Sequence, residues 1–372
     1  MQIEVYEMNP TESGVTITLT AVCDSFSSLL WDVQYYGCGN FEVYIAANAR
    51  NIAIFQTGRI IGRDDDKQHY GIIESVTLET DAENGDYLTV TGRFLMSLLS
   101  RRIIYPTLSF SALTSYADMV RLAVYRNCMQ SDNRLTPGLR HGNTNGDCWE
   151  QKSRLQVSYE NLMDWIFKVC EIIGGTANIR LQETTAGSGV YTMMLDLSQG
   201  TDRSIQQEEN AHIVFSDSYC NLLTFDYSTD LSVQRNVAYV FGCGEGAERK
   251  QALCYRGDEP ASLDRYEVFV DAKDVSDETQ ENGETVAISE EDYLGLLTER
   301  GAEKLVPITE ISESTIAADN RQYQYNRDYF VGDYVTVEHE RFGLIQPKIQ
   351  LVGMIESYEQ NGRTLTPTFK GV

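Results

Sequence analysis

The chain has 372 residues and a net charge of −25 at pH 7, from 55 acidic and 30 basic side chains. At roughly 150 residues per domain this length predicts two or three domains, and a 42% hydrophobic content can supply their cores. The charge argues against nucleic acid or an anionic membrane surface as the main partner, because both are bound through clustered Lys and Arg.

Other bulk features of the sequence exclude several further classes. No stretch approaches the roughly 18 consecutive apolar residues of a membrane span, and residues 1–7 lack the basic segment and apolar core of a secretory signal. We therefore expect synthesis and folding in a cytosol and no stable membrane insertion. The four histidines have no metal-like spacing, so we expect neither a metal nor another cofactor.

The cysteines show no pairing pattern. No two of them form a Cys-x-x-Cys motif, and a chain of this length folds without disulfides, so we expect reduced and mostly buried thiols. The eight are Cys23, Cys38, Cys128, Cys148, Cys170, Cys220, Cys243 and Cys254.

The first quarter of the chain has the period-two alternation of β-strands. A turn at Asn84-Gly85 supplies the positive φ that a tight hairpin needs. This number of short strands predicts a small barrel or sandwich. The predicted strands are residues 15–21, 41–45, 52–55, 59–61, 72–78 and 87–91.

Between residues 94 and 174 the apolar period becomes helical. Ser111 and Thr114 are candidate N-caps of a helix with an apolar face over residues 116–124. Ser158 is the predicted N-cap of the clearest helix, which ends at Gly174. We expect residues 137–149, which are rich in Gly and Asn, to form an exposed loop.

Strands return after residue 177. One more helix is predicted at about 289–305, capped by Ser289 and followed by acidic residues that suit its N-terminal end. Asn361-Gly362 predicts a second tight hairpin near the end of the chain. The predicted strands are residues 177–182, 190–197, 222–227, 233–241, 266–270, 334–337, 348–358 and 364–367.

A glycine-rich loop at residues 242–246 follows a predicted strand, as a phosphate-binding loop does. A phosphate site needs a helix N-terminus next and no carboxylate facing the phosphate. Glu245 lies inside this loop, and strand-like residues 252–255 follow soon after it. We interpret the loop as a turn that uses the conformational freedom of glycine.

Asp64, Asp65 and Asp66 could bind a hard cation. A calcium loop, however, places its ligands at alternate positions and closes with a bidentate Glu. Three adjacent carboxylates followed by Lys67 are more typical of a solvated turn. We predict no metal ligands here.

The Asp147-Cys148 pair resembles the nucleophile motif of cell-wall cysteine peptidases, and His212 could act as the downstream base. The residues after Cys148 provide no apolar helix face to seat a nucleophile. A reactive thiolate also needs a positive environment and an orienting third residue, and none can be named. We predict no catalytic residues and no enzymatic activity.

More than half of the net charge falls in one segment. Residues 258–319 contain eighteen acidic and four basic side chains, a net −14. The simplest interpretation is a solvated loop and helix face. The alternative is a surface that repels DNA or meets a basic partner.

The order of these elements resembles the siphophage tail-hub family, also called baseplate hub or tail-associated proteins. Each motif alone is a general β signature, and their order carries the resemblance over nearly the whole chain. The matching segments are residues 39–45, 58–61, 71–76, 88–93, 98–103, 236–246, 265–272, 297–305 and 329–337 and the terminal hairpin.

The resemblance implies an α+β, mostly β protein with two small β-barrel domains flanking an inserted α+β region. We divide the chain into a first barrel (1–108), the insert (109–230) and a second barrel with an inserted helix (231–372). The resemblance also implies a homotrimer at the virion tail tip, assembled in the host bacterial cytoplasm. Its expected partners are a tail tube or distal tail protein, a tape-measure protein, and a spike, fibre or receptor-binding protein.

The implied function is structural: the hub joins these tail parts and leaves a channel through which DNA passes without specific binding. The family has no invariant catalytic set, so no active-site residue is transferred. Two alternatives remain open, namely a carbohydrate- or receptor-binding tail-tip protein and a cell-wall cysteine hydrolase.

Overall fold

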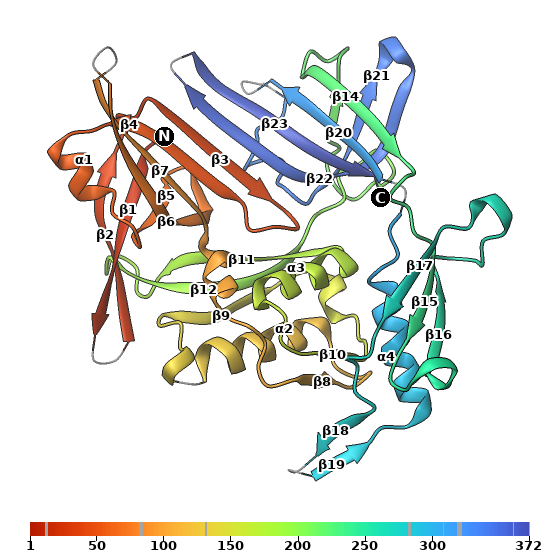
Figure 1. Cartoon of the computed structure of the whole chain (residues 1–372). Helices are drawn as coiled ribbons and strands as arrows, with labels where there is room; N and C mark the ends of the chain where they lie inside the picture. Colours follow the sequence, from red (N-terminus) through yellow and green to blue (C-terminus); the bar gives the residue numbers. More distant parts are fainter. Residues whose placement is uncertain are drawn as a thin grey trace.

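The computed structural model describes residues 1–11, 14–81, 85–130, 132–281, 284–307, 309–317, 322–359 and 361–371. Two β regions lie side by side along the top of the molecule, with a layer of helices and strands beneath them and a small lobe at one side (Figure 1). Sixteen strands join in one sheet, whose main path is β11-β12-β2-β1-β5-β6-β7-β4-β3-β22-β23-β20-β14.

The N-terminal β region forms from alternating strands whose apolar sides enclose a core around Trp31. Residues 52–55, predicted as a strand, instead end a short helix, because the Asn48 side chain caps it by accepting a hydrogen bond from the Asn51 amide. The predicted turn at Asn84 lies outside the described residues. The elements are β1 (Ile3–Thr11), β2 (Gly14–Cys23), β3 (Ser28–Gln34), β4 (Asn40–Ala46), α1 (Ala49–Ile54), β5 (Ile60–Arg63), β6 (Asp66–Asp81) and β7 (Gly85–Phe94).

In the middle layer one helix, α3, packs against β11, and the other, α2, packs against α3. All three candidate caps lie too early. Ser115, rather than Ser111 or Thr114, caps the first helix. Asn161, rather than Ser158, caps the second by accepting from the Met163 and Asp164 amides. Gly174 ends the second helix in the left-handed conformation, as predicted. The elements are β8 (Leu108–Phe110), α2 (Tyr116–Val124), β9 (Leu139–Thr144), β10 (Leu155–Val157), α3 (Leu162–Ile173), β11 (Gly175–Glu183) and β12 (Val190–Gln199).

The exposed loop expected at 137–149 was wrong. This segment contains β9, which pairs in parallel with β12, and a short 3-10 turn that buries Cys148 and Trp149. The Trp149 indole donates to the Ser198 carbonyl over 2.9 Å, which ties the turn to the end of β12.

The C-terminal β region surrounds a second core that includes Phe215, Leu351 and Phe369. The turn at Asn361-Gly362 joins β22 to β23 as predicted, with Glu359 paired to Gly362. The strands are β13 (Val214–Ser216), β14 (Leu222–Asp230), β20 (Thr309–Ile316), β21 (Tyr334–His339), β22 (Leu344–Glu359) and β23 (Gly362–Gly371).

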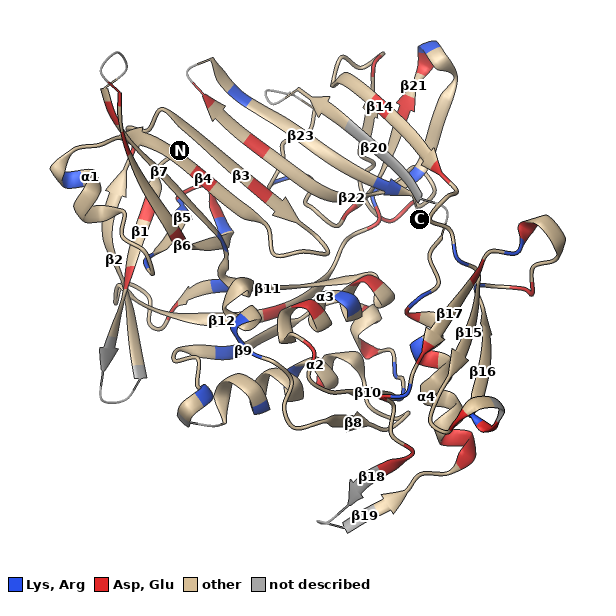
Figure 2. Ribbon diagram, viewed as in Figure 1, with Lys and Arg blue, Asp and Glu red and all other residues tan. Residues whose placement is uncertain are grey.

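A small lobe has its own three-stranded sheet, β16-β15-β17, with one helix on it and a separate hairpin, β18-β19. Ser289 caps the helix as predicted, by accepting from the Asp292 amide over 3.1 Å. Much of the acidic segment lies in this lobe (Figure 2). The elements are β15 (Val237–Phe241), β16 (Gln251–Tyr255), β17 (Glu267–Asp271), β18 (Glu278–Glu281), β19 (Glu284–Ala287) and α4 (Glu290–Ala302).

Short turns link these elements. A π-turn follows α2 at Tyr125–Met129. The 3-10 turns are Leu95–Arg101, Asp132–Arg134, Asp147–Glu150, Gly246–Glu248, Ser262–Asp264 and Glu340–Phe342. Within the described ranges, no helix is long and apolar enough to cross a membrane.

The α+β, mostly β class is confirmed, but the two β regions are not closed barrels in the part of the chain described. β2 pairs with β1 on one edge and with β12 on the other, and β3 pairs with β4 on one edge and with β22 of the other region on the other. The sheet path therefore stays open, from β11 to β14. The division at 108 and 230 stays a prediction; β13 and β14, from the middle range, pair with β21 and β20.

Candidate functional site

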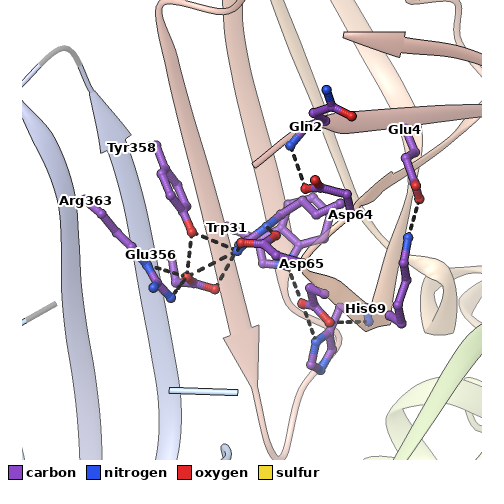
Figure 3. A network of polar contacts seen from close by, with 12 residues as sticks. Gln2, Glu4, Trp31, Asp64, Asp65, His69, Glu356, Tyr358 and Arg363 are labelled. Carbon is purple, nitrogen blue, oxygen red and sulfur yellow. Dashed lines mark hydrogen bonds and ion pairs between the residues drawn. The ribbon is translucent and has the colours of Figure 1, made fainter. Parts of the chain in front are cut away.

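A buried charge network lies where the two β regions meet. The register of β3 and β22 places Trp31 opposite Glu356, whose side chain is fully buried. Arg63, at the end of β5, donates to Glu356 over 2.8 Å, and Arg363, from β23, donates over 3.0 Å. The Tyr358 hydroxyl donates to the same carboxylate over 3.1 Å, as Figure 3 shows.

The network compensates its own charges. Arg63 is completely buried and also makes a two-point ion pair with Asp65, at 2.9 and 3.0 Å. Burial would lower the pKa of Arg63, but Asp65 and Glu356 raise it well above its ordinary value, so the guanidinium stays charged. A buried pair like this is tolerated only with complete hydrogen bonding, so it favours one register of β3 against β22.

Asp66 extends the network on the N-terminal side. Its buried carboxylate accepts from the Trp31 indole over 3.1 Å and from His69 Nδ1 over 2.9 Å. Asp64 instead accepts from the Gln2 amide over 2.6 Å. The three adjacent aspartates thus have three separate partners, and within the described residues no group of His, Cys, Asp and Glu converges on a metal position.

Asp66 makes the stability of the folded chain depend on pH in the acid range. Burial would raise the pKa of Asp66, but His69 and Arg63 outweigh it and hold that pKa well below the ordinary value. The unfolded chain, with a carboxyl pKa of about 3.9, therefore binds a proton before the native state does. The stabilisation is complete above that value and is lost as the pH falls further.

We predict that Asp66→Asn removes part of this acid sensitivity. Denaturant unfolding at pH 7 and pH 3.5 should show a smaller loss of stability in the variant than in the parent chain. Asp24→Asn, at an exposed position, is the control and should leave the difference between the two pH values unchanged. Equal pH dependence of parent and Asp66→Asn would contradict the assignment.

A cleft of about 740 Å³ borders the network and separates the start of β6 from the polar face of β11 and β12. The Asn178 amide donates across it to the Gln68 carbonyl over 2.6 Å. Arg180 forms an ion pair with Asp196 and donates to Gln182. The Asn178–Gln68 bond ties the lower layer to the N-terminal β region, whereas both Arg180 contacts lie within the lower layer.

The structure does not bring Cys148 and His212 together as a catalytic pair. The Cys148 side chain lies in the core of the middle layer, beside the position where a Cβ on Gly175 would be. Burial raises the pKa of the Cys148 thiol to about 11, and Asp147 adds to the rise. His212 is exposed, and its Nε2 lies 2.7 Å from the Gln207 carbonyl. A buried, protonated thiol opposes nucleophilic catalysis.

We predict that Cys148 resists alkylation while Cys220, the exposed cysteine, reacts readily. At pH 8 iodoacetamide should modify Cys148 at least about 100-fold more slowly than Cys220, because the Cys148 thiolate is scarce and buried. Peptide mass mapping of native and denatured protein measures both sites. Modification of Cys148 at the rate of Cys220 in the folded protein would revive the hydrolase hypothesis.

The loop at 242–246 is part of a hairpin between β15 and β16. The Gly242 amide donates to the Lys250 carbonyl over 2.8 Å, and the Cys243 amide donates to the Tyr293 hydroxyl over 2.7 Å. A Cβ on Gly242 would lie 2.3 Å from that hydroxyl. Glycine is needed here for close packing on α4, and a 3-10 turn rather than an α-helix follows.

Sequence reasoning missed Arg63 and Glu356. Each is a charged residue within or directly after an apolar run, Ile60-Ile61-Gly62 and Met354-Ile355. Such a placement is a signal for a buried ion pair. It could not identify the partner, which lies almost 300 positions away in the sequence.

With this geometry described, comparisons show what the chain is similar to. The family model for Siphovirus ReqiPepy6 Gp37-like proteins matches residues 3–369. The tail protein of Neisseria meningitidis MC58 has a TM-score of 0.59 at 13% identity, covering 99% of this chain and 95% of its own. The 43 kDa tail protein of prophage MuSo2 from Shewanella oneidensis has a TM-score of 0.56 at 12% identity, covering 99% and 98%.

A third structure, the prophage tail protein gp18 of Listeria monocytogenes EGD-e, has a TM-score of 0.51 at 11% identity, covering 99% of this chain and 94% of its own. No curated protein matches the sequence. The fold is thus that of a phage tail-type protein. The chain belongs to the Siphovirus ReqiPepy6 Gp37-like family, which confirms the resemblance to siphophage tail proteins.

Proposed function

We propose that this chain is a structural hub protein of a phage tail and that it is not an enzyme. The observation that supports this most is the shared sheet: one chain presents two β regions, each with its own core, joined through β3 and β22. The buried charges at the join favour one relative placement of the two regions. Three such chains would present six β regions, which matches a sixfold tail tube to a threefold tip.

The proposed partners follow from this role. The homotrimer would contact the tail tube or a distal tail protein on one side and a spike, fibre or receptor-binding protein on the other, with the tape-measure protein inside. DNA would pass through the ring without specific binding. The net charge of −25 supports this, because like charges keep the DNA backbone from adhering to the ring.

Mass photometry and negative-stain microscopy test the proposal. The full chain, expressed with its neighbouring tail proteins, should form particles that contain three copies of the 42.0 kDa chain arranged as a ring. A chain that stays monomeric at micromolar concentration, both alone and with those neighbours, overturns the hub role. Binding of the isolated monomer to a glycan array would support the receptor-binding alternative instead.

A further inference from the structure

The three-stranded sheet of the lobe has its smaller apolar side chains on the covered face. Helix α4 packs on Ala238, Val240, Cys254 and Val270, all of which are buried. Gly301 allows this close approach, because a Cβ there would lie 2.5 Å from the Cys254 sulfur. Since side chains alternate along a strand, Val237, Tyr239 and Phe241 of β15 are on the opposite face, where Val237 is buried and Tyr239 and Phe241 are partly exposed.

That opposite face carries a continuous apolar row. The strand register aligns Leu253, Tyr239 and Phe269 across β16, β15 and β17. Phe269 is 62% exposed and Leu253 is 44% exposed. Phe241 lies next to this row, with its ring centre 5.4 Å from that of Phe269. We call these four residues together with Tyr255 the outer lobe face.

The outer lobe face points away from the body of the protein. Helix α4 lies between the sheet and the middle layer, where Asp292 forms an ion pair with Arg154 (Figure 1). Within the described residues, no strand or helix packs on the outer side of this sheet. A solvated sheet face is normally polar, so a contiguous aromatic face marks an interaction site.

The edge of this face is acidic. Arg249 stacks on Phe241 and is paired with Asp271, while Arg265 stacks on Tyr239 and is paired with Glu267. Both arginines are therefore neutralised by carboxylates. Residues 237–274, which form the three strands and their connecting turns, contain eight acidic and five basic side chains, a net charge of −3.

We propose that the outer lobe face binds a second, different tail protein through a surface with an apolar centre and a rim of Lys and Arg. Aromatic side chains at the centre, with Arg side chains stacked on them at the edge, are the composition of a protein interface. The acidic edge repels DNA, RNA and anionic membranes, and it also repels the same face of another copy of this chain. This proposal rests on the chain being a tail component.

Site-specific photo-crosslinking in assembled particles tests the proposal. A benzophenone amino acid replaces Phe269, the particles are irradiated, and the adduct is identified by mass spectrometry. We expect an adduct with one other tail protein whose crosslinked surface is basic. Phe342, which is 72% exposed on the C-terminal β region, is the control position and should not give that adduct. An adduct only between copies of this chain, or none in particles that contain the chain, overturns the proposal.

A substitution separates the interface from the fold. Phe269→Ser should leave the melting temperature of the isolated chain unchanged within about 2 °C, since the ring is mostly exposed. The variant should bind the crosslinked partner at least tenfold more weakly than the parent chain does. For the parent chain, raising NaCl from 0.1 to 0.5 M should weaken binding to the same partner. The control, Phe342→Ser, should change neither the melting temperature nor the binding of that partner.

Three results would count against the interface in different ways. Unchanged partner binding by Phe269→Ser contradicts it directly. Binding of neutral glycans that is lost in Phe269→Ser would assign the face to carbohydrate instead. If the chain is missing from purified particles, the proposed tail function fails before the interface is tested.

Discussion

Replacing Glu356 by glutamine is expected to lower the free energy of unfolding by about 3–5 kcal/mol. Arg63 and Arg363 both donate to this carboxylate, and Arg63 is fully buried. The amide keeps the shape of the side chain but removes its negative charge. Two guanidinium groups would then face each other with only Asp65 to compensate them. Urea unfolding followed by circular dichroism measures the change.

Two variants make this result specific to buried charge. Glu74→Gln breaks the Glu74–Arg93 pair, in which both side chains are partly exposed, and should cost about 1 kcal/mol or less. The triple replacement of Arg63, Glu356 and Arg363 by Met, Leu and Met should recover much of the stability lost in Glu356→Gln, because it removes the three buried charges together. Asp65, which loses Arg63, is 42% exposed and can be hydrated. A loss below 1 kcal/mol in Glu356→Gln would show that the network does not stabilise the junction between β3 and β22.

Gly301→Ala is expected to destabilise the lobe by about 1–3 kcal/mol. Gly301 is buried in α4, and a Cβ would lie 2.5 Å from the Cys254 sulfur and 2.6 Å from a Val240 methyl carbon. Both neighbours belong to the core face of the sheet, so α4 would have to move outward. Native-state hydrogen exchange of the β15 and β16 amides measures the local stability.

Gly295→Ala is the matched control in the same helix. A Cβ at that position meets only the end of the Arg154 side chain, at 3.7 Å. Alanine should therefore raise stability by about 0.5–1 kcal/mol, through its better helix propensity. If both substitutions stabilise the lobe, the tight packing of α4 on Cys254 is refuted.

Local signals in the sequence predicted local structure well. The Ser289 cap, the end of α3 at Gly174 and the hairpin turn at Asn361-Gly362 each depend on residues that are neighbours in the chain. The α3 cap was predicted too early because Ser158 and Asn161 both have side chains that suit an N-cap, and only the fold distinguishes them.

Features that depend on distant partners were not predictable. The alternation of Val237, Tyr239 and Phe241 predicts a strand, but it does not show that α4 covers the other face. Nor does it show that on this face Val237 is buried while Tyr239 and Phe241 stay partly exposed. The burial of Asp66 depends on Trp31, and that of Arg63 on Glu356. The open sheet depends on β2 and β3 each having one partner in another region, β12 and β22, besides β1 and β4 of their own.

The pairing of β3 with β22 also sets an order of events during synthesis. Residues 28–34 leave the ribosome long before residues 344–359, the strand that completes their edge. At about 5–20 residues per second, the edge of β3 stays uncovered for tens of seconds. Glu356, the buried partner of Arg63, is synthesised after a similar delay. A nascent chain halted before residue 344 therefore exposes an unpaired strand edge and leaves Arg63 with Asp65 but without Glu356, and we expect chaperones to bind it.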